Sequence, residues 1–199
     1  ARDTVRGVDY QIGTGTLTVT EGSGEQTFEL YLVYVYAVEI DWTADDFTTE
    51  VKAADGTVMT PGEPHKFASY VGYPYLMAPG TYTWSVQPSE ARAAEGYQAS
   101  QPTSQKLTGS ASWSVTLPQI VSTDFVVPKG GRVVMHSIPA TTYGQGALVA
   151  ASADLTGDDS DVYTFRLKAG SSYIYQATGD GLVTATGMFK STGATTRYD

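Results

Sequence analysis

The chain has 199 residues, of which 41% are hydrophobic and 17% charged, so it can bury a core as one large domain or two small ones and is not disordered in composition. Its net charge of −9 would repel a phosphate backbone, which argues against a nucleic-acid partner. The absence of cysteine excludes disulfides, thiolate nucleophiles and iron–sulfur clusters, and no run of ~20 apolar residues could cross a bilayer as a helix.

The first half of the chain reads as a series of strands. Polar and apolar residues alternate over 14–20, which is the period of a half-buried strand. Residues 28–40 are crowded with β-branched and aromatic side chains, and they predict one long strand, or two joined at a bend, that is covered on both faces. Residues 47–53 and 57–59, separated by the turn signal Asp55-Gly56, predict a hairpin.

Glycine and proline punctuate the segment that follows. Pro79-Gly80 predicts a tight turn inside the strand-like run 76–86. Ser89 can cap a short helix over 90–94 that Gly96 would end, and this is the only helix that the sequence supports.

Strand-like segments recur through the rest of the chain at the spacing of a β-sandwich. They are residues 112–117, 125–127, 132–135, 147–151, 162–167, 172–175 and 182–185. We therefore predict an all-β protein of two β-sandwich halves with very little helix, an N-terminal domain over 1–118 and a C-terminal domain over 119–199. Residues 77–81 and 167–171 share an apolar strand end, a glycine turn and a tyrosine-containing strand; this is either an internal duplication or two hairpins of a common kind.

No reactive centre is readable from the sequence. His65 and His136 lie outside any metal-ligand spacing, and a hydrogen-bonded structural role is the commoner one for such residues. Asp45 and Asp46 would point to opposite faces of an extended strand, so they cannot form the facing pair of a glycosidase. The four carboxylates of 154–161 could ligate calcium, but their spacing lacks the EF-hand glycine and glutamate, which favours a solvated acidic turn. We predict no enzyme activity, no metal site and no cofactor.

Aromatic residues are the candidate ligand-binding residues. Tyr70, Tyr73 and Trp84 could form a platform for glycans, because flat aromatic faces and hydroxyl groups bind sugar rings in β-sandwich modules. The alternating pattern around Trp84 also suits a core position. We expect Tyr70 and Tyr73 to lie in a loop that contains glycine and proline, which makes them the stronger ligand candidates.

Three segments of the first 90 residues resemble a known family. They are 15–19 (Gly-Thr-Leu-Thr-Val), 46–58 with its Asp-Phe start and Asp-Gly turn, and 76–83 (Leu-Met-Ala-Pro-Gly-Thr-Tyr-Thr). These segments are similar to the N-terminal part of fimbrillin-like surface proteins of the Bacteroidales, and to an uncharacterised surface-lipoprotein domain of the same bacteria. Here Met77-Ala78-Pro79 stands where the family pattern has Leu-Pro-Ala.

The resemblance implies transthyretin-like, Greek-key β-sandwiches in an exported lipoprotein of the outer membrane, with its leader removed. In fimbrillins an arginine-specific protease removes an N-terminal strand, and a strand of the next subunit fills the groove by β-augmentation. The polar residues 191–199 do not suit such a donor strand. We therefore expect a cell-surface adhesion or fimbrial-type structural protein, whose partners are other surface or pilus subunits. The alternative is a carbohydrate-binding module of a surface glycan-utilisation system, with host or bacterial glycans as its partners.

Overall fold

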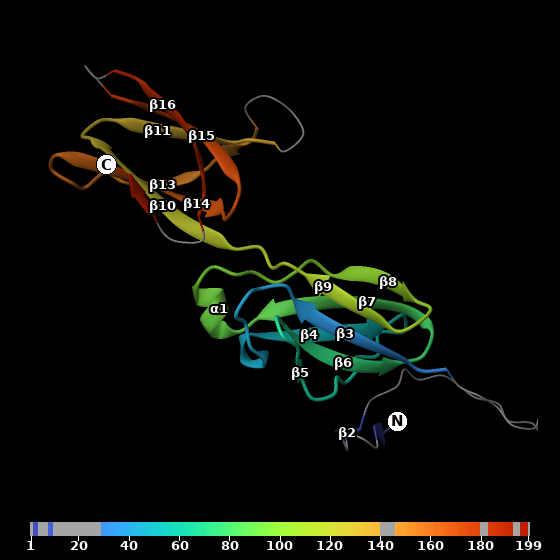
Figure 1. Ribbon diagram of the computed structural model, residues 1–199. Coiled ribbons are helices and arrows are strands. Elements are labelled where there is room, and N and C mark those ends of the chain that lie inside the picture. Colours follow the sequence, from blue (N-terminus) through green and yellow to red (C-terminus); the bar gives the residue numbers. More distant parts are fainter. Residues whose placement is uncertain are drawn as a thin grey trace, which may run out of the picture. The chain divides into compact units, whose positions relative to one another are not determined.

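The computed structural model describes residues 2–3, 8–9, 29–139, 146–179, 183–192 and 196–198, and strands dominate them (Figure 1). The predicted all-β class is confirmed. Within these ranges the only α-helix is α1 (Glu90–Ala94), and the 3-10 turn η1 (Ala44–Asp46) precedes β4. The strands are β1 (Arg2–Asp3), β2 (Val8–Asp9), β3 (Tyr31–Ala37), β4 (Phe47–Ala53), β5 (His65–Lys66), β6 (Val71–Met77), β7 (Gly80–Pro88), β8 (Thr103–Leu107), β9 (Ala111–Val115), β10 (Ile120–Pro128), β11 (Arg132–Ser137), β12 (Leu148–Val149), β13 (Ala151–Asp154), β14 (Ser160–Lys168), β15 (Ser172–Thr178), β16 (Ala185–Lys190) and β17 (Thr196–Tyr198).

The chain divides into two compact units, unit 1 (Ala1–Leu117) and unit 2 (Pro118–Asp199). Unit 1 contains two sheets, with the strand orders β5-β6-β3-β9 and β4-β7-β8. Unit 2 contains two sheets with the orders β13-β14-β10-β17 and β12-β11-β15-β16. The strands β1 and β2 form a separate two-stranded sheet. No helix in the described ranges has the length and apolar character needed to cross a membrane.

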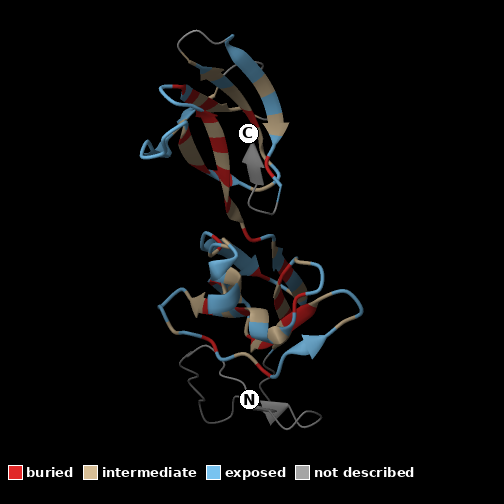
Figure 2. Cartoon of the chain, turned by 90° about the vertical axis from the view of Figure 1, so that its left-hand side faces the viewer, coloured by how far each residue is buried: buried red, intermediate tan, exposed pale blue. Residues whose placement is uncertain are grey.

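Each unit builds its core from alternate residues of its strands, so that buried and accessible positions succeed one another along the ribbon (Figure 2). β10 shows this period over its whole length, because Val121, Thr123, Phe125 and Val127 are buried while the residues between them are not. The core of unit 1 contains residues of both sheets, among them Val33 from β3 and Val51 from β4. Both units are therefore β-sandwiches.

The two units repeat one topology. The sheet β5-β6-β3-β9 of unit 1 corresponds strand by strand to β13-β14-β10-β17 of unit 2. The sheet β4-β7-β8 corresponds in the same way to β11-β15-β16. The strand directions also agree, since β9 is parallel to β3 and β17 is parallel to β10, while the other pairs of these strands are antiparallel. Even the short β12 beside β11 has a counterpart in the isolated bridge between Lys52 and Val58.

The repeated glycine-turn pattern marks the same step in both units. β6 and β7 belong to different sheets, as do β14 and β15, so the chain crosses the sandwich at each turn. The hairpin interpretation of this pattern is therefore wrong. In unit 1 the Tyr82 hydroxyl donates to Ala78 O at 2.8 Å, and in unit 2 the Lys168 N–H donates to the Tyr173 hydroxyl oxygen at 2.9 Å. Each crossing is thus tied to its own turn by a tyrosine that follows it, as in a tyrosine corner.

Two local predictions are confirmed. The hairpin after β4 closes through Ala53 N–H to Thr57 O at 2.9 Å, and Gly56 supplies the positive φ of its turn, +87°. Helix α1 begins after Ser89, whose hydroxyl oxygen accepts the Arg92 N–H at 3.4 Å.

The prediction for residues 28–40 needs correction. Only 31–37 form a strand, and one of its faces is buried, with Val33 and Val35 fully inside the core. The other face is not covered by a second layer of main chain but by the aromatic side chains described below. The predicted strand 14–20 lies outside the described residues.

Candidate ligand-binding surface

Five aromatic side chains gather on the outer face of β3 and β6, and we call them the outer aromatic cluster. They are Tyr34, Tyr36, His65, Phe67 and Tyr70. The Tyr70 ring is nearly parallel to the rings of Tyr36 and Phe67, with centroid separations of 4.3 and 4.5 Å. Phe67 in turn meets Tyr34 and His65 edge-on, at 5.1 and 4.5 Å.

Local sequence explains why these rings meet. Tyr34 and Tyr36 occupy the positions of β3 that alternate with its buried valines, so their side chains leave the sheet on the outer face. The segment between β5 and β6 then folds back, because the Phe67 N–H donates to Tyr70 O at 2.8 Å and closes a tight turn. This turn places the Phe67 and Tyr70 rings over the tyrosines of β3.

Unit 2 shows that the fold does not require this cluster. On β10, the counterpart of β3, the residues that alternate with the buried ones include Ser122 and Asp124. The Asp124 carboxylate accepts a hydrogen bond of 2.7 Å from the hydroxyl of Thr164 on β14. The accessible positions of β10 include Ile120, Ser122, Asp124 and Val126, so the same topology forms with a mixed outer face that has no aromatic residue on this strand. Tyr36 packs partly against the core of unit 1, but the topology itself does not require an aromatic cluster there.

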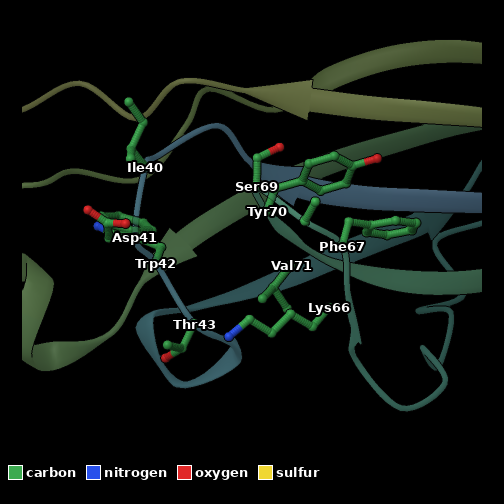
Figure 3. Close-up of a pocket in the computed structure, with 10 residues that line it drawn as sticks. Ile40, Asp41, Trp42, Thr43, Lys66, Phe67, Ser69, Tyr70 and Val71 are labelled. Carbon is green, nitrogen blue, oxygen red and sulfur yellow. The ribbon is translucent and has the colours of Figure 1, made fainter.

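A pocket of about 500 Å³ opens beside the cluster. The segment that follows β3 forms one wall and the segment that follows β5 forms the other (Figure 3). The lining residues are Ile40, Asp41, Trp42, Thr43, Lys66, Phe67, Ala68, Ser69, Tyr70 and Val71. Trp42 is only 7% exposed and forms a firm base, whereas Ile40 is 88% exposed at the rim.

Backbone geometry sets the first wall of the pocket. Asp41 has a φ of +68°, the left-handed conformation that aspartate tolerates better than most non-glycine residues. This turn lies between the exposed Ile40 and the buried Trp42, so it directs these neighbouring side chains to different environments.

The base of the pocket is held by an ion pair on its far side. Arg92 donates Nε–H to Asp46 Oδ1 at 2.8 Å, and its guanidinium lies 5.3 Å from the centre of the Trp42 ring. The Arg92 guanidinium, helped by the N–H and hydroxyl of Thr43, holds the pKa of Asp46 below its ordinary value. The Asp46 carboxylate is thus held by Arg92 and Thr43. It therefore does not form a pair of facing catalytic acids with Asp45.

The structure does not assemble the platform of Tyr70, Tyr73 and Trp84. Trp84 is 5% exposed and stacks on Trp113 in the core, with centroids 5.9 Å apart, so it offers no face to a ligand. Tyr73 lies within β6 and not in a loop, and its hydroxyl donates to Ala44 O at 2.8 Å. Burial raises the pKa of Tyr73. Of the three, only Tyr70 lines the pocket.

Tyr70 also differs from an open stacking platform. Tyr36 and Phe67 both lie parallel to it at short distance without contacting each other, so they cover opposite faces of its ring. Tyr70 therefore offers no open face for stacking, and Figure 3 shows its hydroxyl at the end of the ring farthest from Trp42 and Thr43. The sequence analysis did not identify Tyr36, Phe67 or Lys66 as candidate site residues. The aromatic residues on both faces of 28–40 could have indicated Tyr36.

The remaining sequence candidates have structural environments. His65 lies in β5 and is exposed, while His136 lies in β11 with Nδ1 3.3 Å from Gly146 O. The acidic turn 154–161 is anchored by the Lys129 ammonium, which donates to Gly157 O at 2.9 Å and lies 3.2 Å from Asp161 Oδ1. A lysine thus takes the central place that a cation would need. Within the described residues, no three acidic, histidine or cysteine side chains are grouped so that they could hold a metal ion.

No protein-family model matches the sequence, and no curated protein matches it either. Three solved structures resemble the fold. The TIE protein of Bacillus anthracis matches with a TM-score of 0.35 and 12% identity over 85% of this chain, which spans 33% of that protein. The fimbrial anchor protein Mfa2 of Porphyromonas gingivalis matches with a TM-score of 0.35 and 10% identity, over 78% of this chain and 82% of the other. A putative adhesin of Bacteroides ovatus matches with a TM-score of 0.33 and 10% identity, over 88% of both chains.

Proposed function

We propose that this chain is a non-enzymatic adhesion protein of the cell surface, and that unit 1 binds the ligand through the outer aromatic cluster and its pocket. The carrying observation is the contrast between the two units. Unit 2 completes the same topology with Ile120, Ser122, Asp124 and Val126 at accessible positions of β10, so the fold does not require the aromatic residues Tyr34 and Tyr36 at these positions of β3. Aromatic side chains that are only partly buried beside a concavity are a common form of binding site, and Tyr34, Tyr36, Phe67 and Tyr70 are partly buried.

The ligand that fits this surface best is a saccharide. The aromatic residues Phe67 and Tyr70 line the pocket together with Thr43 and Ser69, which carry hydroxyl groups. Sugars combine apolar C–H faces with many hydroxyl groups, so they are bound by aromatic rings interspersed with polar side chains. The carbohydrate-binding alternative thus describes how the adhesion protein recognises its target.

A glycan array with the purified chain tests this proposal. Wild-type protein should bind at least one glycan class, and the double variant Phe67→Ala/Tyr70→Ala should lose about tenfold or more in affinity, since each ring removed forfeits about 1 kcal/mol of contact. The control is Leu148→Ala/Val183→Ala, which removes exposed apolar side chains of unit 2. Tryptophan fluorescence confirms that unit 1 stays folded, and Tyr70→Phe offers a milder variant. Equal binding by the double variant and the control would contradict the proposal.

A second function, assembly with other surface or pilus subunits, is supported by the outer edge of β16. This strand ends its sheet, Met188 on it is 72% exposed, and its only charged residue is the terminal Lys190. Its counterpart β8 is polar and carries Lys106 near its middle, which protects an edge against strand addition. We propose that β16 pairs with an extended strand of another subunit.

Sedimentation velocity at rising concentration tests the edge proposal. We expect self-association of the wild-type chain that Met188→Lys abolishes, because a charge at an edge opposes pairing. Ser104→Lys on β8 is the matched control and should change nothing. A chain that stays monomeric at every concentration would contradict pairing between copies. Export to the outer membrane belongs to the same proposal, and cell fractionation of the source organism tests it.

A further inference from the structure

We propose that the pocket of unit 1 selects an acidic saccharide, with the Lys66 ammonium as the group that binds the sugar carboxylate. This inference rests on the proposed saccharide binding and adds the charge of the ligand. It starts from the position of Lys66, which lies in β5 and lines the pocket next to Phe67.

Of the lysine and arginine side chains that the structure describes in unit 1, two are paired with carboxylates and two are not. Lys52 pairs with Glu50 at 2.8 Å, and Arg92 pairs with Asp46 and Glu95 at 2.8 and 3.0 Å. Among the residues that the structure describes, Lys66 and Lys106 have no carboxylate within ion-pairing distance, although the chain has a net charge of −9, and of these two only Lys66 lines the pocket. In an acidic protein, a lysine that stays unpaired at the rim of a pocket is available to an anion from outside.

The direction of the side chain supports this role. Figure 3 shows the Lys66 amine extended toward Thr43 and away from the Phe67 ring, with Asp41 on the Thr43 side of the pocket and the rings of Phe67 and Tyr70 on the other. A carboxylate bound at the Lys66 amine would therefore lie beside Thr43, and the rest of the sugar would extend toward Phe67 and Tyr70.

Unit 2 again serves as the internal reference. β13, the counterpart of β5, has the sequence Ala-Ser-Ala-Asp and contains no cation. The topology therefore does not require a lysine at this edge, just as it does not require the aromatic cluster. The two features without a counterpart in unit 2 lie together around one hollow, and one compact carboxylate on a sugar ring would use both.

Paired ligands test the charge directly by isothermal titration calorimetry on the full chain. The acidic probes are tetragalacturonate and 3′-sialyllactose, and the neutral partners are the methyl ester of tetragalacturonate and lactose. Wild-type protein should bind at least one acidic probe about tenfold more tightly than its neutral partner, as expected for one charge-assisted hydrogen bond. Lys66→Gln should abolish this ratio, and added salt should reduce it. Lys106→Gln, which removes the exposed lysine of β8, should leave the ratio unchanged.

The possible failures point to different errors. Equal affinity for the acidic and neutral probes in the wild-type chain would overturn the role of Lys66 but leave saccharide binding intact. A preference for the acidic probe that survives Lys66→Gln would also overturn it. Binding of none of the four probes by folded protein would overturn the acidic-saccharide proposal, and the glycan array would then decide separately on saccharide binding. Lys66 is exposed on a two-residue strand, so its substitution is not expected to unfold unit 1.

Discussion

Unit 1 and unit 2 repeat one strand order but stabilise their sandwiches differently. Within the described residues, the core cluster of unit 1 contains sixteen buried hydrophobic side chains, including all three tryptophans of the chain, whereas that of unit 2 contains seven. Unit 2 instead anchors its acidic turn with Lys129, which reaches two main-chain carbonyl groups and the buried Asp161. The same topology can therefore form with very different numbers of buried hydrophobic side chains.

What the units share is what the topology needs. Both have strands of period 2, both have a parallel final strand, and both cross between sheets at a glycine-containing turn tied by a tyrosine. What they do not share are the outer aromatic cluster with Lys66 in unit 1 and the Lys129 anchor in unit 2. The unshared features are the ones to connect with function or with local stability.

The largest effect is expected from the two cores. Phe47→Ala in unit 1 and Phe165→Ala in unit 2 each remove a ring that is 1% exposed, so each should lower the free energy of unfolding by about 3–5 kcal/mol. We also propose that the units unfold independently. Tryptophan fluorescence reports on unit 1 alone because Trp42, Trp84 and Trp113 all lie there, and NMR of methyl groups follows unit 2.

The proposal of independent unfolding is wrong if either variant shifts the unfolding transitions of both units. In guanidinium titrations, Phe47→Ala should shift the fluorescence transition and leave the unit 2 signals in place, and Phe165→Ala should do the reverse. A single coincident transition would show that the units form one cooperative body. Separate expression of 29–117 and 118–199 provides a second test of the same proposal.

The next effect concerns the anchor that only unit 2 has. Lys129→Met leaves the Asp161 carboxylate, which is 3% exposed, with the Gly130 N–H as its remaining partner at 2.8 Å. A buried charge that loses its counter-ion is costly, and we expect unit 2 to lose about 1–3 kcal/mol. Lys190→Met, on the exposed end of β16, is the control. An unchanged unit 2 midpoint in Lys129→Met would show that solvent replaces the ammonium.

The shared tyrosines sharpen the comparison from the other side. Tyr82→Phe and Tyr173→Phe each remove one hydrogen-bonding hydroxyl from a side chain that is 4% or 6% exposed. Because each hydroxyl is hydrogen-bonded to the main chain of its own turn, we expect the free energy of unfolding of each unit to fall by a similar amount, about 1 kcal/mol. Thermal unfolding should show this as a fall of about 4–8 °C in the corresponding Tm. A loss in one unit only would show that the crossings are not equivalent.

Sequence patterns predicted the elements whose cause is local. The period of alternation, the Asp55-Gly56 turn and the Ser89 cap depend on neighbouring residues, and these predictions hold. Sheet order was not predictable in this way, because strand pairing depends on contacts far apart in the chain. The residues on both sides of Pro79-Gly80 are typical of a hairpin turn. Only the pairing of β7 with β4 and β8 shows that the chain crosses from one sheet to the other at this point.

The candidate site was predicted only in part for the same reason. Tyr70 and Trp84 have the same chemistry in the sequence, but one borders a pocket and the other fills a core. Which of them meets solvent is decided by how the segment 66–71 folds back on β3. That contact joins residues about thirty positions apart, and no local pattern encodes it.

The smallest predicted effect separates the units by pH. The pKa of Asp46 is held below its ordinary value of 3.8, chiefly by the Arg92 side chain, so the folded protein binds this proton less readily than the unfolded chain. The stabilisation is complete above about pH 5 and is lost as the pH falls through the lowered folded pKa. Since the Asp46 and Arg92 side chains are 17% and 26% exposed, we expect about 0.5–1 kcal/mol in unit 1. Asp46→Asn should remove this part of the acid dependence of the fluorescence transition, whereas Asp45→Asn on the exposed neighbour should retain it. If both variants keep the wild-type acid profile, the ion pair behind Trp42 contributes nothing to the stability of the pocket base.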